Sequence, residues 1–303
     1  MENKYVVQNA LDIIDRRITE GINPRELAAE CGYSVFHFGR VFSGVTGITL
    51  MAYITRRKLQ YAVYDLSCGE KIIDIAVKYS FETHAGFTRA FKKCFGCAPS
   101  LYRIHAGCGR PERMELNELI SIISGGNMMY PEIVEMPPFN VVGFTSRHQM
   151  PGVRSTYNIP LYWETINLDC AGPLTRLHHV FSKSKHSEVT ACFDIDPLKS
   201  EFMYLLGVGV DNPADLAKIE PDMFLMKMAG GLYARFTTPL VEAAKHSQNV
   251  RDTWKNIFDN WLPASAYRFD EKRRDYEYYD LRDHAWENNG MEQMDIYIPI
   301  LKH

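Results

Sequence analysis

Two short segments place an arginine between two phenylalanines at the same spacing. These segments are FGRVFSGVTG (residues 38–47) and FTRAFKKCFG (residues 87–96), and they lie 49 residues apart. On a helix, phenylalanines four residues apart share a face, and the arginine between them points elsewhere. In most proteins, a cluster of positively charged side chains on a helix only marks the face that is exposed to solvent. The repetition favours a second interpretation, in which Arg40 and Arg89 use their guanidinium groups to bind guanine or phosphate.

The cysteines offer a second kind of chemistry. The chain has seven cysteines, an odd number without the spacing of a disulfide framework, which indicates a reducing compartment. Cys94 and Cys97 form a single CxxC pair. A zinc site needs two more ligands at a workable spacing, and none is evident. A redox role is the alternative, but inert thiols are favoured, and we expect neither a metal nor a cofactor.

The two arginines belong to a repeated unit. Leu27-Ala28 aligns with Ile75-Ala76 at an offset of 48, so the second copy has one extra residue. In the first copy, Asn23 predicts the start of a short helix that stops at Gly32, and Ser34 can cap the next helix. Small alanines, a glycine-containing turn and an arginine-bearing helix are the features of a helix-turn-helix.

A long helix is predicted between the two copies. Residues 50–69, LMAYITRRKLQYAVYDLSCG, keep helical character for about seventeen residues, or roughly 25 Å at 1.5 Å per residue. Such a helix can hold two reading helices about one DNA turn apart, near 34 Å, on the same side of a duplex.

The repeated segment resembles the AraC/XylS family of transcription regulators. The matching residues are Gly32-Tyr33-Ser34, Phe38, Arg40, Phe42, Gly47, Tyr53, Arg57, Ala62, Leu66, Asp74-Ile75-Ala76, Phe81, Phe87, Arg89, Phe91, Lys92, Gly96, Pro99 and Tyr102-Arg103. The resemblance implies an all-α tandem helix-turn-helix DNA-binding domain over residues 1–106. One departure is Ser80, which stands where the family usually has glycine in the second turn.

The same resemblance implies which residues face DNA. The groove-facing positions are Val35, Phe36, Gly39 and Arg40 in the first reading helix, and His84, Ala85, Gly86 and Arg89 in the second. Lys92, Lys93 and Arg103 are expected to contact phosphates, which set affinity and register. For either groove-facing arginine, an ion pair within its helix or at the core edge is the alternative.

Length and charge predict two domains with different tasks. The chain has 303 residues and a net charge of −3. Residues 1–110 contain 15 Lys/Arg and 10 Asp/Glu, a net charge of +5. Residues 111–303 contain the other 19 Lys/Arg and 27 Asp/Glu, a net charge of −8. A basic segment joined to an acidic one is compatible with polyanion binding by the first. Residues 107–128 are predicted to be a linker with a short helix, with Gly125-Gly126 as pivot.

Residues 129–303 are predicted to form an α+β domain, a sheet with helices packed on one face. The expected elements are a strand, a Pro-Pro bend and a strand (130–150), a helix (159–170), a strand (200–210), two strands around Gly230-Gly231, a helix (239–263), and strands at 273–283 and 291–300. This half resembles the GyrI-like, BmrR-like effector-binding domain. The matching pieces include IVEMPPFNVVGF (133–144), LLGVGV (205–210), GGLYARF (230–236), Trp254 to Pro263, DYEYYD (275–280) and MDIYIPI (294–300).

This second resemblance implies capture of a bulky, apolar, often cationic small molecule. In such domains aromatic faces and a buried carboxylate hold the cation. Glu277 and Tyr279 match the expected pair and share one face of a strand. The expected walls are Trp163, Tyr204, Trp254, Phe258 and Trp261. A solvent-facing glutamate on an edge strand and ordinary core aromatics are the alternatives.

Together the two halves have the arrangement of Rob-like regulators. We therefore expect a ligand-responsive transcription regulator, an activator by resemblance, that is not an enzyme. Its partners are double-stranded DNA, a small-molecule effector and, for an activator, RNA polymerase; both monomer and dimer stay open. The alternatives are a GyrI-like hydrolase that uses Glu277 as general base, and a constitutive DNA binder with a protein-interaction module. Without a signal-peptide core or an apolar run of ~18 residues, the chain is expected to be cytoplasmic and to avoid membranes.

Overall fold

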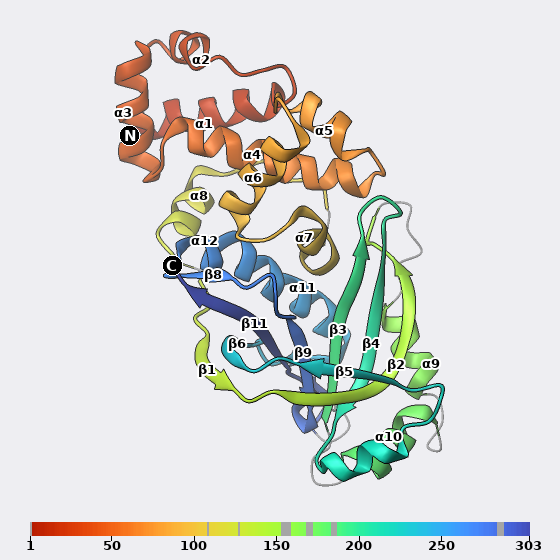
Figure 1. Cartoon of the computed structure of the whole chain (residues 1–303). Coiled ribbons are helices and arrows are strands. Elements are labelled where there is room, and N and C mark those ends of the chain that lie inside the picture. Colours follow the sequence, from red (N-terminus) through yellow and green to blue (C-terminus); the bar gives the residue numbers. More distant parts are fainter. Residues whose placement is uncertain are drawn as a thin grey trace. The chain divides into compact units, whose positions relative to one another are not determined.

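The computed structural model describes residues 2–107, 109–126, 128–152, 159–167, 172–182, 187–283 and 288–303. The chain divides into two compact units (Figure 1). The first contains the residues up to Met128, with Gly152 and Lys255–Ala264, and the second contains Met129–Pro151 and most of the residues that follow. No single helix of the described residues is long and apolar enough to cross a bilayer, and only a pair bent by 67°, Val35–Thr46 with Leu50–Ser67, passes that test.

The first unit is helical. Its helices are α1 (Glu2–Arg16), α2 (Pro24–Glu30), α3 (Val35–Thr46), α4 (Leu50–Ser67), α5 (Ile72–Lys78), α6 (His84–Phe95), α7 (Pro99–Ala106) and α8 (Leu116–Ile123). The segment Lys255–Ala264 adds a π-helical turn, η3 (Ile257–Trp261), and α12 (Leu262–Ala264).

The predicted repeat is confirmed in the backbone. The bounds of α5 lie 48 residues after those of α2, and the bounds of α6 lie 49 residues after those of α3. The turn after the first helix of each copy has a left-handed residue, Gly32 with φ 81° and Ser80 with φ 63°. Ser34 and Thr83 then cap α3 and α6 through their side chains. Glu82, just before Thr83, is the extra residue of the second copy.

The phenylalanines of both copies form the core of their helix-turn-helix. Phe38 and Phe42 of α3, and Phe87 and Phe91 of α6, are each 0% exposed. They contact their neighbours ring to ring, as Phe87 does with Phe91 at a centroid distance of 6.0 Å. The prediction that these rings pack inward is therefore confirmed, and it leaves the opposite faces of α3 and α6 for polar side chains.

The segment that the sequence analysis assigns to a linker packs on the first unit instead. The side chain of Gln8 on α1 donates to the carbonyl of Met114 (3.1 Å) and accepts from the N–H of Leu116 (2.7 Å). Leu116 and Leu119 of α8 are buried. The apolar face of α8 explains the difference, because exposing that face to water as a free linker would cost free energy.

The second unit is built on an antiparallel sheet. Its strands are β1 (Glu132–Met136), β2 (Phe139–Gln149), β3 (Ser187–Asp196), β4 (Glu201–Gly209), β5 (Phe224–Met228), β6 (Gly231–Thr237), β8 (Tyr267–Phe269), β9 (Tyr276–Asp280) and β11 (Asp295–Lys302). They follow the order β1-β6-β11-β9-β3-β4-β2-β5, and β8 pairs with the end of β11. Short strands β7 (Val241–Glu242) and β10 (Met291–Glu292) form a separate pair.

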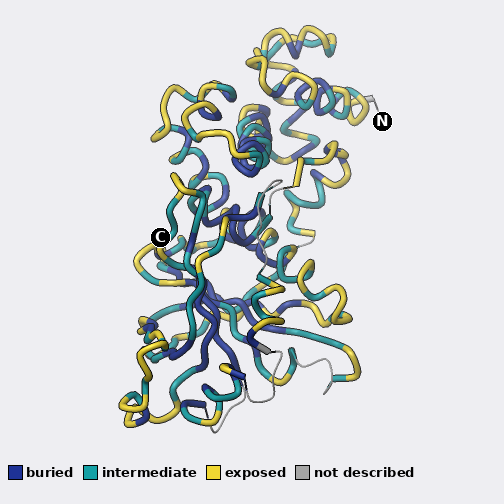
Figure 2. The backbone as a smooth tube through the Cα atoms, turned by 90° about the vertical axis from the view of Figure 1, so that its right-hand side faces the viewer, coloured by how far each residue is buried: buried dark blue, intermediate teal, exposed yellow. Residues whose placement is uncertain are grey.

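Helices accompany the sheet, as the sequence predicts. They are α9 (Ile159–Asn167), α10 (Pro173–Phe181) and α11 (His246–Asn256), with short 3₁₀ turns η1 (Pro213–Lys218), η2 (Ala243–Lys245) and η4 (Leu281–Asp283). The middle of the sheet is buried (Figure 2), and its core cluster includes Val141, Val189, Leu205, Tyr233 and Tyr276.

Two features of this unit differ from the predictions. The helix expected from Pro239 begins only at His246, because Val241–Glu242 forms a strand with β10. The strand β3 and the helix α10 were absent from the predicted elements. In β3 the first six residues, SEVTAC, are all buried, so its sequence lacks the alternation that marks a half-buried strand.

Candidate DNA interface and effector site

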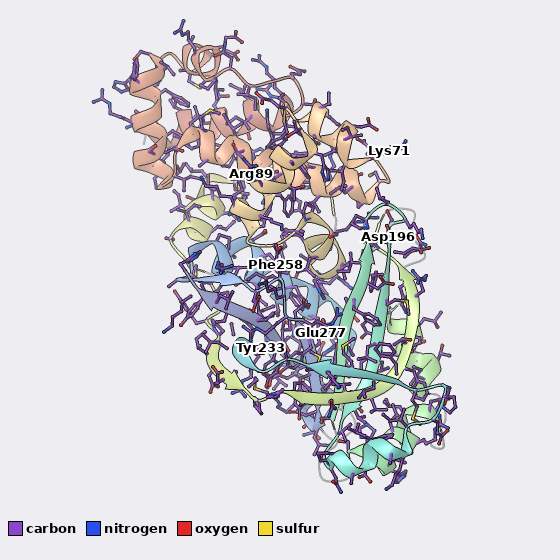
Figure 3. The ribbon with its side chains drawn as sticks, in the orientation of Figure 1. Lys71, Arg89, Asp196, Tyr233, Phe258 and Glu277 are labelled. Carbon is purple, nitrogen blue, oxygen red and sulfur yellow. The ribbon has the colours of Figure 1, made fainter. Side chains whose placement is uncertain are left out.

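The two reading helices present equivalent arginines to solvent. Arg40 on α3 and Arg89 on α6 are exposed, and neither is paired with a described carboxylate. Arg89 is labelled in Figure 3. The alternative of an ion pair within the helix is therefore not observed in the described residues. The first unit thus offers two guanidinium groups at corresponding positions of a repeated motif.

The other predicted groove-facing positions differ in exposure. Phe36 is 84% exposed, an unusual state for so large an apolar ring, and His84 and Ala85 are also exposed. The remaining three, Val35, Gly39 and Gly86, are half-buried at the edges of the same surfaces. An exposed phenylalanine at the start of α3 can contact a thymine methyl group.

Of the three predicted phosphate contacts, one does not fit. Lys93 is exposed and Lys92 is half-buried, both in the last turn of α6. Arg103 is only 7% exposed, and its guanidinium lies close to Gly152 within the first unit. A guanidinium buried in this way cannot reach a phosphate, so Arg103 is removed from the candidate interface.

In the second unit, Glu277 of β9 is held by three side-chain donors. Trp254 of α11 donates from Nε1 to Oε1 (2.8 Å), and Oε2 accepts from Thr190 Oγ1 (3.0 Å) and Tyr279 Oη (2.7 Å). Glu277 and Tyr279 therefore share one face of the strand, as their spacing predicts. Figure 3 marks Glu277 within the second unit. We call Glu277, Thr190, Trp254, Tyr279, Tyr204 and Trp163 the Glu277 cluster.

Aromatic rings complete the Glu277 cluster. The indole of Trp163 lies 4.9 Å from the ring of Tyr279, centroid to centroid, and donates to Tyr204 Oη (2.9 Å). Burial and the nearby charge of Glu277 raise the pKa of Tyr204 and of Tyr279 well above the usual value for tyrosine. Both hydroxyls therefore stay protonated. Tyr279 donates to Glu277, Tyr204 accepts from Trp163, and the carboxylate of Glu277 is the acidic group among them.

Two predicted wall residues lie elsewhere. Phe258 and Trp261 belong to the first unit, where the ring of Phe258 lies 5.7 Å from that of Tyr102. Trp254 and Phe258 would share a face of a regular α-helix, but a π-helical turn begins at Ile257 and changes the direction of the following side chains. Their assignment to the effector site is therefore corrected.

Thr190 is not among the site residues predicted from the sequence. Its Cα is the cross-strand partner of Glu277 in the pairing of β3 with β9. The two residues are 87 positions apart, and the pairing register of distant strands leaves no local signal in one sequence.

A further group of polar side chains lies beside the Glu277 cluster, where the ring of His246 is 6.3 Å from that of Tyr279, centroid to centroid. His246 Nε2 lies 3.3 Å from Asp283 Oδ1, and His246 Nδ1 lies 3.3 Å from Glu292 Oε2. Burial, together with the charge of Glu292 and of other acids, raises the pKa of Asp283 to about 8. The pKa of His246 is lowered by burial.

Comparison with known proteins supports the family resemblance of each half of the chain. Residues 27–104 match a helix-turn-helix domain family, and residues 132–300 match the family of integron-associated effector binding proteins. The Right origin-binding protein of Escherichia coli (strain K12) is 36% identical over 104 residues, which are 34% of this chain and 36% of that protein. The HTH-type transcriptional activator AarP of Providencia stuartii is 34% identical over 100 residues, 33% of this chain and 74% of AarP. The match thus spans about a third of the Right origin-binding protein and about three quarters of AarP.

A solved structure is similar to the second unit in outline. It is SAV2435 bound to tetraphenylphosphonium, with a TM-score of 0.42 and 17% identity over 57% of this chain and 94% of that protein.

The fold and its relatives define a class, transcription regulators that join an AraC-type helix-turn-helix domain to a GyrI-like effector-binding domain. Within this class, the chain belongs to the family of integron-associated effector binding proteins, whose match covers more than half of its length.

Proposed function

We propose that the chain reads a specific DNA site with α3 and α6 and responds to a bulky apolar cation bound at the Glu277 cluster. The observation that carries the DNA half is the pair of exposed arginines, Arg40 and Arg89, at equivalent positions of two reading helices, neither of which pairs with a carboxylate in the part of the chain that the structure describes. An exposed guanidinium is available for the bidentate contact to guanine that gives sequence discrimination. Lys93, and Lys92 beside it, would add phosphate contacts.

The effector half of the proposal is supported by the chemistry around Glu277. Three donors hold its carboxylate, and one of them is Tyr279. The ring of Trp163 lies against Tyr279, and Trp163 donates to Tyr204. Aromatic faces and a fixed negative charge attract a delocalised cation, and the ligand's charge offsets the cost of desolvating the carboxylate. Because both oxygens of Glu277 already accept hydrogen bonds, the arrangement suits a counter-charge better than a general base.

We further propose that the protein is an activator. AarP, which it resembles in the first unit, is named a transcriptional activator. RNA polymerase is then a partner of the DNA-bound protein.

The test begins with selection of bound fragments from the source genome by the purified full chain. The best fragment is titrated at several salt concentrations, with the wild type and with Arg40→Ala and Arg89→Ala. We expect each substitution to weaken binding to the selected site by ~1–3 kcal/mol, with little loss on unrelated DNA. Arg268→Ala, which removes an exposed arginine from β8 of the second unit, is the control and should leave affinity unchanged.

Two outcomes would reject the proposal. If no fragment is enriched, with or without a lipophilic cation, the helix-turn-helix does not act as a DNA reader. If the arginine variants bind the selected site as tightly as the wild type, α3 and α6 do not face the groove as assigned.

A further inference from the structure

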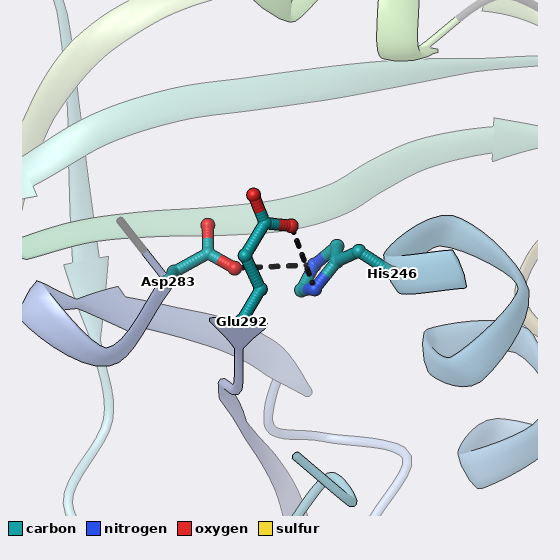
Figure 4. A group of neighbouring side chains, drawn as sticks. All are labelled: His246, Asp283 and Glu292. Atoms are coloured by element: carbon teal, nitrogen blue, oxygen red, sulfur yellow. Dashed lines mark ion pairs between the residues drawn. The ribbon is translucent and has the colours of Figure 1, made fainter. Parts of the chain in front are cut away.

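His246, Asp283 and Glu292 meet from three separate segments of the second unit (Figure 4). One ring nitrogen of His246 and one oxygen of each carboxylate lie within 4.8 Å of one another. Their side chains are 14%, 17% and 18% exposed, so the cluster is largely removed from water. We propose that these three residues bind a divalent transition-metal ion.

The segments that carry the three side chains are tied together by the backbone. β10, which ends at Glu292, pairs with β7, and the N–H of Ala243 donates to the carbonyl of Gly290 (3.0 Å), just ahead of α11 and His246. The N–H of Gln293 donates to the carbonyl of Arg282 (3.0 Å), beside Asp283. Ligands that are already assembled favour binding of a metal ion, and these bonds hold the three residues in place without one.

The neighbouring acids show why this cluster needs a cation. Asp280 and Asp295 both accept hydrogen bonds from Arg282, at 2.8 Å each. In contrast, the described residues give Asp283 and Glu292 only one shared partner, the imidazole of His246. Two carboxylates and one imidazole leave the buried group with a net negative charge, and an isolated buried charge is costly.

Two atoms inside the cluster also have unused bonding capacity. His246 Nδ1 and Asp283 Oδ1 are buried, and neither makes a hydrogen bond with a described residue. Buried polar atoms without a hydrogen bond are uncommon in proteins, and a bound ion is one of the recognised explanations. A histidine ring nitrogen and a carboxylate oxygen are both common metal ligands.

The donor set indicates the class of ion. One imidazole nitrogen and two carboxylate oxygens suit Zn²⁺ and related first-row ions, whereas an imidazole is a poor ligand for Mg²⁺ or Ca²⁺. In a tetrahedral zinc site the ligand atoms lie about 3.4 Å apart, calculated from bond lengths of about 2.0–2.1 Å. The 3.3 Å between His246 Nε2 and Asp283 Oδ1 already meets this spacing.

The test uses the full-length protein, stripped with a chelator and then titrated with Zn²⁺ by calorimetry. We expect one zinc ion per chain that is bound ~10-fold or more weakly in His246→Gln, Asp283→Asn and Glu292→Gln. The matched control is His178→Gln, because His178 lies beside Glu188 (2.7 Å) and outside the group of His246, Asp283 and Glu292, and should not affect zinc affinity. Mg²⁺ should not compete.

Co²⁺ provides an independent measurement on the wild type, since the chain also has seven cysteines. Nitrogen and oxygen ligands should give weak visible bands and no thiolate-to-cobalt charge-transfer band. The proposal is overturned if the stripped wild type binds neither ion, which would leave a metal-free ion-pair group. It is also overturned if the three variants bind zinc as tightly as the wild type, or if the cobalt spectrum shows thiolate ligands.

Discussion

The carboxylate of Glu277 is held by donors from three elements, Thr190 of β3, Trp254 of α11 and Tyr279 of β9. Together these bonds fix the position of one negative charge beside aromatic rings. A bound cation would interact with that charge, and a neutral molecule of the same shape would interact only with the rings. The charge and the shape of the site can therefore be separated by experiment.

Glu277→Gln keeps the length of the side chain and removes its charge. We expect the affinity for tetraphenylphosphonium to fall ~10-fold or more, because a contact to a charged group contributes ~1.5–3 kcal/mol. The affinity for the neutral triphenylphosphine oxide should change much less. Both ligands are titrated by fluorescence quenching, with Glu135→Gln, an exposed glutamate of β1, as control. Equal losses for the two ligands would contradict the counter-charge role.

Ser80 has the left-handed backbone that glycine provides in the first copy at Gly32. A side chain with φ 63° is strained, and glycine removes that strain at a smaller entropic cost. Ser80→Gly should therefore stabilise the protein by about 0.5–1 kcal/mol, measured by urea denaturation. Ser43→Gly in the middle of α3 should instead destabilise it, because glycine weakens a helix interior. If Ser80→Gly destabilises the protein, the serine contributes a contact that outweighs the strain.

At the scale of elements, local signals decided what could be predicted from the sequence. The bounds of α2 and α3 follow from Asn23, Gly32 and Ser34, capping residues and a glycine that act within a few positions, and these helices are predicted well. The strand β3 pairs with the next strand, β4, and on its other side with β9, more than 80 residues away. Its first six residues are all buried, so no alternation marks it as a strand, and the pairing of Thr190 with Glu277 leaves no local signal in the sequence.

The helix that carries Trp254 shows the same limit. The resemblance to effector-binding domains implies Trp254, Phe258 and Trp261 as walls of one site, with ordinary core aromatics as the alternative. The change from α- to π-helical geometry at Ile257 sends the last two into the core of the first unit, where both are buried. A change of helix type of this kind depends on packing partners such as Tyr102, which lie far away in the sequence.

Arg57 connects two helices of the first unit through a buried ion pair. Its Nε and Nη2 donate to the two carboxylate oxygens of Asp15, at 2.6 and 2.8 Å, and Nη2 also donates to the carbonyl of Glu112. Its side chain is 3% exposed. Arg57→Ala leaves the carboxylate of Asp15 buried without its partner, so we expect a loss of ~3–5 kcal/mol in the free energy of unfolding.

The double substitution Arg57→Ala with Asp15→Ala separates the contribution of the ion pair to stability from the contribution that each side chain makes by packing. It should lose less stability than the two single variants lose in sum, because the uncompensated charge is gone. Urea denaturation of all four proteins measures this difference. If the two effects simply add, the residues stabilise the helices independently and the pair itself contributes nothing.

At the scale of the whole chain, one stretch of helix joins the two units covalently. Trp254, which donates to Glu277, is the last residue of the second unit before the chain enters the first at Lys255. Five residues after Trp254, the carboxylate of Asp259 accepts a hydrogen bond from Tyr102 of α7 (2.9 Å). A cation that competes with the indole N–H for Glu277 therefore acts on the helix that continues into the DNA-binding unit.

This connection predicts a coupling between effector and DNA that depends on Trp254. In the wild type, saturating tetraphenylphosphonium should change the affinity for the selected DNA site about 5-fold or more, and the DNA should change the affinity for the cation by the same factor. Trp254→Phe keeps an aromatic ring but removes the hydrogen-bond donor to Glu277. The cation should then hardly change the affinity for DNA, and DNA should hardly change the affinity for the cation, while each ligand still binds. Trp163→Phe removes a different indole bond, the one to Tyr204, and should retain the coupling. If Trp254→Phe keeps the full factor, effector binding reaches the DNA-binding unit by another route, because the hydrogen bond to Glu277 is the interaction that this substitution removes.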